Sequence, residues 1–117
     1  MDAREDVSRY LPLTEGAYYI LLALTEPLHG YAVMQRVEAL SEGAVAMGPG
    51  TLYGAFAALE KAGLIAKDHE EERRKVYALT PKGRRALEAQ MERIEIMARS
   101  GAAVLGRNAA PRSTIGA

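Results

Sequence analysis

Positively charged side chains are concentrated in one part of the chain. Residues 61–85 include eight lysines and arginines but only four acidic residues, with basic clusters at 73–75 and 82–85. Over the whole sequence fifteen basic residues balance fifteen acidic ones, so the formal net charge is zero. Ammonium and guanidinium groups gathered on one surface bind phosphate, and the local surface rather than the net charge decides such contact. The distribution is therefore compatible with nucleic-acid binding.

Other chemistry finds little support in the residue types present. The chain has no cysteine, which excludes a disulfide framework, a thiol nucleophile and a thiolate metal site, and which fits a reducing compartment. Its two histidines are His29 and His69. His69 precedes three glutamates, but one histidine beside solvated carboxylates does not form a closed metal site. Neither histidine has a serine partner at a recognisable spacing, and there is no glycine-rich phosphate loop. We expect no catalytic residues, no metal and no cofactor, and therefore no enzyme.

Three short helices are predicted in the first half of the chain. Thr14 is a suitable N-cap for an apolar helix, which Pro27 ends because the residue before a proline disfavours helical geometry. A second helix is expected to start at 29–30 and to stop at 41–43. A third is expected to start with Pro49 in its first position. The inner positions of these two helices recur every three or four residues and are Tyr31, Met34, Val37 and Leu40, then Leu52, Phe56 and Leu59.

The pattern changes after the third helix. Residues 64–68 and 75–79 are typical of strands, and we expect the intervening 69–74 to be a charged loop at the tip of a β-hairpin. Thr80 and Pro81 then start a last helix. Its inner positions follow heptad spacing and are Leu87, Met91, Ile94, Ala98, Gly101 and Leu105. Monomers avoid an exposed apolar stripe, and the preceding elements already have a core. We therefore predict that this stripe joins two copies of the chain.

The order of these elements predicts one domain that is mainly α with a small β-hairpin. We expect an N-terminal arm at 1–12, a winged helix–turn–helix domain at 13–80, a long C-terminal dimerisation helix at 81–105 and a disordered tail at 106–117. The longest apolar run, 17–24, is too short to cross a bilayer, and the charged N-terminus does not resemble a signal peptide. A cytoplasmic protein without membrane contact is expected.

A winged helix–turn–helix places a slim helix in the major groove of DNA and flanking groups on phosphates. The third predicted helix suits this role because its outward residues are small, and the hairpin tip carries arginines that can reach phosphate or the minor groove. The candidate contacts to double-stranded DNA are Thr51, Tyr53, Gly54, Lys61, Arg73, Arg74 and Lys75. The glutamates at 70–72 would repel phosphate, so we expect them to face away or to pair with the arginines.

Most of these candidates also have a simpler interpretation, which for Arg73 and Arg74 is a plain charged turn. Thr51 either contacts DNA or is only a first-turn helix residue, and Tyr53 either contacts phosphate or packs half-buried against the second helix. Lys61 is better interpreted as a solvated lysine. For Lys75, alternation along the strand leaves open which face of the hairpin the side chain occupies. The arginines at 84–85 either flank DNA or form a solvated face, which is the default.

Several segments resemble the PadR family of bacterial transcriptional regulators. They are Gly50-Thr51-Leu52-Tyr53, the stretch from Leu59 to Ile65, the stretch from Arg74 to Leu87, and Leu28-His29-Gly30-Tyr31 upstream. The resemblance covers about residues 13–105, and one long helix after the hairpin is similar to the short-tailed branch. It implies a homodimer that binds an inverted-repeat operator, usually as a repressor, with the C-terminal helix making the dimer. Some relatives bind flat aromatic compounds against a tryptophan of that helix, which this sequence lacks.

Two other functions are kept as alternatives. The same fold can dock another protein without touching DNA, and the acidic run at 70–72 favours that hypothesis. A ligand-binding or enzymatic role at the dimer interface is the second. If the chain binds DNA, a small-molecule effector between the subunits would act by changing the separation of the two recognition helices, because it would bind two states with different affinities.

Overall fold

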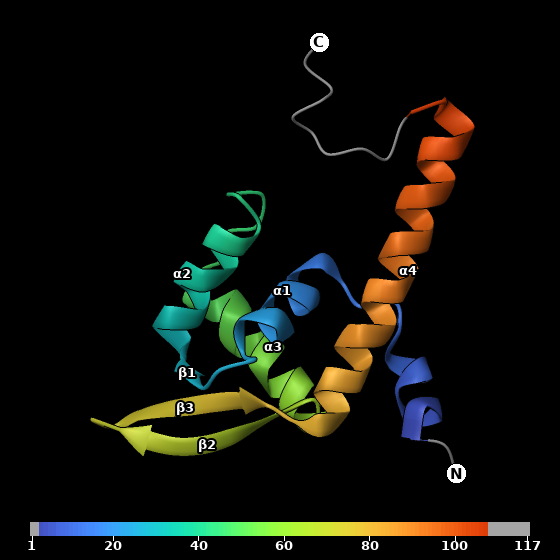
Figure 1. Cartoon of the computed structure of the whole chain (residues 1–117). Coiled ribbons are helices and arrows are strands. Elements are labelled where there is room, and N and C mark those ends of the chain that lie inside the picture. The colour runs from blue at the N-terminus through green and yellow to red at the C-terminus, as the bar shows by residue number, and fades with distance from the viewer. Residues whose placement is uncertain (1–2, 108–117) are drawn as a thin grey trace.

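The computed structural model describes residues 3–107 as four α-helices, a 3-10 helix and a three-stranded antiparallel sheet (Figure 1). The prediction of a mainly helical winged fold with a small hairpin is confirmed. In chain order the elements are η1 (Ala3–Tyr10), α1 (Glu15–Ala23), β1 (Leu28–His29), α2 (Gly30–Leu40), α3 (Pro49–Lys61), β2 (Ile65–Glu71), β3 (Arg74–Leu79) and α4 (Pro81–Leu105).

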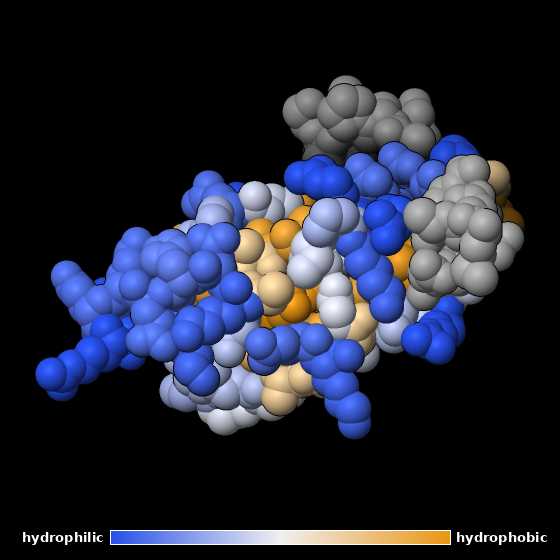
Figure 2. Space-filling view, turned by 90° about the horizontal axis from the view of Figure 1, so that it is seen from below, coloured by the Kyte–Doolittle hydropathy of each residue, from blue (hydrophilic) through white to orange (hydrophobic). Residues whose placement is uncertain are grey.

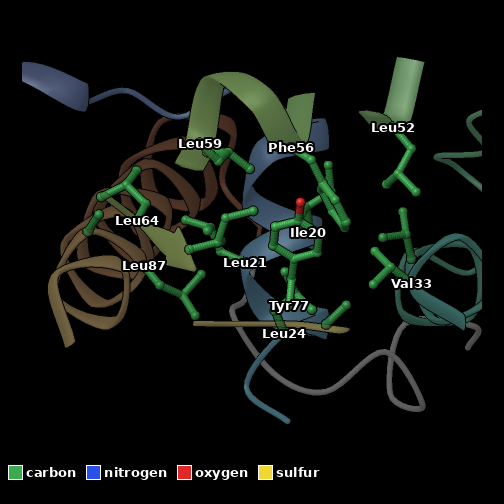
Figure 3. Close-up of a cluster of buried hydrophobic side chains, with 14 of the residues drawn as sticks. Ile20, Leu21, Leu24, Val33, Leu52, Phe56, Leu59, Leu64, Tyr77 and Leu87 are labelled. Carbon is green, nitrogen blue, oxygen red and sulfur yellow. The ribbon is translucent and has the colours of Figure 1, made fainter. Parts of the chain in front are cut away.

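The core forms around α1, which lies between α2, α3, the base of the hairpin and the start of α4 (Figure 3). This short helix is apolar on most sides, so it can be covered from several directions at once. Its buried residues pack against side chains from every neighbouring element. The ten core residues that Figure 3 labels are Ile20, Leu21, Leu24, Val33, Leu52, Phe56, Leu59, Leu64, Tyr77 and Leu87. The inner positions predicted for α3 are all buried, so the outward face of this helix is fixed by the same packing.

The hairpin is longer and more regular than the sequence indicated. Residues 69–71, predicted as loop, continue β2, and the chain reverses in a two-residue turn at Glu72 and Arg73 with φ of 49° and 66°. Positive φ at both central residues is typical of a type I′ turn, whose twist matches that of the flanking strands. The loop prediction was wrong because this ribbon extends beyond the core. Its outer half is exposed on both faces and shows no alternation of apolar and polar residues.

The first turn of α4 is held closely against the turn that leads into β2. Thr80 caps the helix, because its hydroxyl accepts a hydrogen bond from the Gly83 backbone N–H at 3.0 Å and donates one to the Gly63 carbonyl at 2.6 Å. The Thr80 N–H also donates to the Leu64 carbonyl at 3.1 Å. Gly83 is buried, and it faces that same Leu64 carbonyl so closely that a Cβ atom would collide with it.

The segment predicted as an N-terminal arm contains η1, which lies alongside α4 (Figure 1). Val7 is buried in the core cluster. After η1, the Leu13 N–H donates a 2.7 Å hydrogen bond to Oε1 of Gln90 on α4. Helix α4 ends at Leu105 and is followed by Gly106, which has the left-handed backbone common after a helix. The predicted tail at 106–117 lies from residue 108 onward outside the described residues. Over residues 3–107, no helix has the length and apolar character needed to cross a membrane.

Candidate nucleic-acid interface

A groove of about 400 Å³ runs between the start of α2, the first turns of α3 and the tip of the hairpin. It is lined by His29, Gly30, Tyr31, Tyr53, Arg73, Arg74, Lys75 and Tyr77. Figure 2 shows that hydrophilic side chains cover the projecting end of the molecule where the hairpin lies. Three cationic side chains therefore border a concave surface next to the helix predicted to enter DNA, which is an arrangement suited to a phosphate backbone.

Tyr53 forms one wall of this groove. Its ring packs edge-on against Phe56, with 5.9 Å between the ring centroids, and its hydroxyl lies directly against the backbone of Gly30. The side chain nevertheless remains 53% exposed. Packing against α2 and access to a ligand are thus compatible, because the packing fixes the phenol at the rim of the groove. A side chain at position 30 would occupy the space that the Tyr53 hydroxyl takes.

The acidic residues of the hairpin strands and the basic residues near its tip lie on different strands. The sheet order is β1-β3-β2, so the basic residues 74–75 belong to the central strand, next to α2, and the acidic residues 68, 70 and 71 belong to the edge strand. Glu70 Oε1 forms an ion pair with Lys67 Nζ at 2.7 Å, and Glu72 Oε2 lies 3.6 Å from Arg74 Nη2. The glutamate run thus has partners within the hairpin, and its residues do not line the groove.

The imidazole of His69 lies between two carboxylates on the edge strand. Its Nε2 is 2.8 Å from Glu71 Oε1, and its Nδ1 is 2.6 Å from Asp68 Oδ2. Asp68 can reach the ring because β2 contains a register shift between Lys67 and His69, and a bulge re-aims side chains. The hydrogen bonds to Glu71 and then Asp68 raise the pKa of His69 above its usual 6.5.

We expect an NMR titration to give His69 a pKa above 6.5, and Glu71→Gln together with Asp68→Asn to lower it. Because the folded-state pKa is raised, the pairing stabilises the hairpin fully below the unfolded-state pKa and is lost as pH rises through the folded-state pKa. The NMR shifts of hairpin amides should change over that upper interval in the native protein but not in the double variant. A native pKa at or below 6.5 would contradict the geometry.

The remaining candidates lie on the outer face of α3 and not in the groove. Thr51, Gly54 and Lys61 are exposed, with Lys61 at the far end of the helix. The structure therefore brings Tyr53 together with the three basic residues of the hairpin, and leaves Thr51, Gly54 and Lys61 on a surface that only a ligand lying along α3 would meet.

Helix α4 carries its apolar face beyond the domain that it packs on. Leu87 is 4% exposed and belongs to the core of its own chain, so its prediction as a dimer contact is corrected. The predicted positions further along remain uncovered: Met91, Ile94, Ala98 and Leu105 are exposed, and Gly101 is partly exposed. Met97, which the heptad pattern did not include, is 68% exposed. It lines a hollow of about 440 Å³ with Ile94, Tyr18 and Tyr19.

The comparison with known families decides the affiliation of this fold. A model described as "Transcriptional regulator PadR-like family" matches residues 20–89, which run from α1 into α4. The chain belongs to the PadR-like family. Its members are transcriptional regulators and not enzymes, so the expectation that the chain is not an enzyme is confirmed.

Similar PadR-like structures agree over most of the chain. A PadR family transcriptional regulator from Eggerthella lenta is 27% identical with a TM-score of 0.65, and covers 86% of this chain and 92% of its own. A PadR-like transcription factor from Bacteroides fragilis is 26% identical with a TM-score of 0.63, covering 77% and 91% respectively.

Curated relatives also match at the level of sequence. The transcriptional regulator YqjI of Escherichia coli is 34% identical over 69 residues, which are 59% of this chain and 33% of that protein. An uncharacterised 37.1 kDa protein of a Streptomyces fradiae transposon is 43% identical over 72 residues, which are 61% of this chain and 20% of that protein. The chain thus spans a fifth to a third of the length of these relatives.

Sequence reasoning missed four residues that line the groove of this PadR-like domain: His29, Gly30, Tyr31 and Tyr77. Tyr31 was predicted to face inward on α2, but it is 61% exposed, and Val33 is buried instead. Leu40, the other end of that predicted stripe, is also exposed. Position 31 falls in the first turn of α2 at the rim of the groove. Helical spacing alone places residues on a common face without saying which end of the face the core reaches.

Proposed function

We propose that this protein is a sequence-specific DNA-binding transcriptional repressor that acts in the cytoplasm as a homodimer on an inverted-repeat operator. The observation that carries the proposal is the groove beside α3, where Tyr53, Arg73, Arg74 and Lys75 come together. Arginines near the end of a rigid two-stranded ribbon are well placed to bind phosphates or an adjacent minor groove. Thr51, Gly54 and Lys61 are proposed to face the major groove.

The apolar face of α4 supports the homodimer. Met91, Ile94 and Met97 continue the face that the first half of the helix buries, and in a single copy they are exposed. Pairing of two such helices removes this face from water. It also holds two recognition helices a fixed distance apart. About 34 Å, one turn of DNA, is the separation that lets both enter successive major grooves.

A small-molecule effector fits this scheme as a regulator, because the hollow beside Ile94 and Met97 adjoins the face proposed for pairing. The alternative function is a module that docks another protein, which the acidic edge strand favours. The two functions differ in what the arginines of the hairpin do, and the following experiment separates them.

Arg73→Ala with Arg74→Ala is expected to weaken DNA binding and to flatten its salt dependence. The probe is the DNA upstream of the protein's own coding region, and the affinity is measured between 50 and 200 mM salt. Two arginines in each of two subunits account for a decrease of about 3.6 in the slope of log affinity against log salt, at about 0.9 per phosphate contact.

Arg99→Ala with Arg107→Ala removes the same number of charges from the far part of α4 and from the residues just after it, where both side chains are exposed. This control should leave the slope within about 1 of the unmodified protein. Equal slopes for the hairpin variant and the unmodified protein would favour the docking module.

A further inference from the structure

The outer face of α3 is poor in the groups that usually read base pairs. From Pro49 to Glu60 it contains no arginine, lysine, asparagine or glutamine, the side chains that form the common bidentate contacts to guanine and adenine. Its hydroxyls belong to Thr51 and Tyr53. The Tyr53 hydroxyl is turned against Gly30 in the groove. Thr51 is therefore the one neutral hydrogen-bonding group on the outer face of this helix.

What the helix offers instead is methyl groups held at short reach. Thr51, Ala57 and Ala58 are exposed, and their Cγ or Cβ methyl groups flank Gly50 and Gly54. A Cβ atom at either glycine would meet nothing within 4 Å, so no side chain keeps a ligand away from the backbone there. In the major groove the matching apolar feature is the C5-methyl group of thymine, which alanine and the threonine methyl contact in direct readout.

We infer that α3 identifies its half-site chiefly through thymine methyl groups, which Thr51 and Ala57 contact across the major groove. The inference rests on the proposed function and adds the chemistry that selects the operator. Where Arg73 and Arg74 bind phosphates, they supply affinity without reading base edges. Guanine has no cationic partner on this helix before Lys61, its last residue, and the one carboxylate that could accept from cytosine N4 is Glu60 in the last turn.

The test uses the full chain and duplexes of 30 base pairs that it selects from a random library. Each selected duplex is then synthesised with uracil in place of thymine at one symmetric pair of positions at a time, which removes only the methyl group. We expect a weakening of about fourfold per contacted methyl, the value for burying one such group, and about fifteenfold when both half-sites are changed.

Two substitutions of Thr51 separate its methyl group from its hydroxyl. Thr51→Ser keeps the hydroxyl and removes the methyl, so it should abolish the preference for thymine over uracil at one pair of positions. Thr51→Val keeps a methyl and removes the hydroxyl, so it should retain that preference. Ala57→Gly should abolish the preference at a second pair, and its helix content and melting are measured alongside because glycine weakens helices.

Each outcome decides something. If uracil binds as tightly as thymine at every position while binding stays sequence-specific and salt-dependent, the inference is overturned and the proposed function stands. Loss of the preference in Thr51→Val but not in Thr51→Ser would also overturn it, since the hydroxyl would then be the reading group. If no duplex is selected even at low salt, the proposed function and the inference both fail.

Discussion

Replacement of Gly83 by alanine is expected to destabilise the protein by about 3 kcal/mol, the upper part of the range for overpacking a close-packed site. The added Cβ would collide with the carbonyl oxygen of Leu64 and lie 2.7 Å from Leu79 Cδ1. Backbone cannot yield as a flexible side chain does. Moving the helix away instead would break the contacts of Thr80 with the turn at Gly63.

Gly54→Ala is the matched control. It also adds one methyl group to a helical glycine, but nothing lies within 4 Å of that position. Its effect should be the gain of about 1 kcal/mol that alanine brings to a helix interior. Urea unfolding of both variants at one fixed protein concentration measures the difference, since dimerisation would contribute to apparent stability. Equal free energies of unfolding would show that α4 does not approach the turn as closely as described.

Ile94→Glu combined with Met97→Glu is expected to produce monomers and to weaken operator binding at least about a hundredfold. Two carboxylates would be placed in the apolar face proposed for pairing, where each would have to be desolvated. A monomer also loses the second half-site, and linking two binding events contributes 10²–10⁴ in affinity. Sedimentation velocity and DNA titration measure the two effects, and far-UV circular dichroism checks that the helices remain.

Ile96→Glu provides the comparison on the same helix. Ile96 is 55% exposed, and at 100° per residue it projects from the side opposite to the proposed face. Its replacement should leave both the dimer and DNA affinity unchanged. If the double variant remains a dimer, or if Ile96→Glu disrupts association equally, pairing through the Ile94 and Met97 face is excluded.

The sequence predicted the helices well because their ends are marked by local chemistry. Thr14 and Thr80 cap α1 and α4, Pro49 occupies the first position of α3, and Gly63 adopts the positive φ that follows a helix. The positions of these helix ends depend on a few residues that are neighbours in the sequence. They need no knowledge of the tertiary structure.

The features that the sequence did not predict depend on contacts between distant residues. β1 is only Leu28 and His29, and it is a strand because it pairs with Tyr77 and Val76. Leu87 has the same heptad spacing as the exposed residues beyond it, and only the extent of the domain decides that it is buried. The groove was missed for the same reason: its walls come from α2, α3 and β3, and no periodicity relates them.

The direct junction between β3 and α4 has a mechanical consequence. Only Thr80 separates the strand from the helix, and the Leu79 N–H is tied to the Leu24 carbonyl at 2.9 Å. The hairpin and the 25-residue helix α4 are thus joined without a flexible linker, so that a rotation of one changes the orientation of the other. A rod of this length spans about 37 Å, so a swing of roughly 5° about the junction displaces its far end by about 3 Å. We therefore expect small adjustments at that remote end to change the direction in which the arginines of the hairpin point.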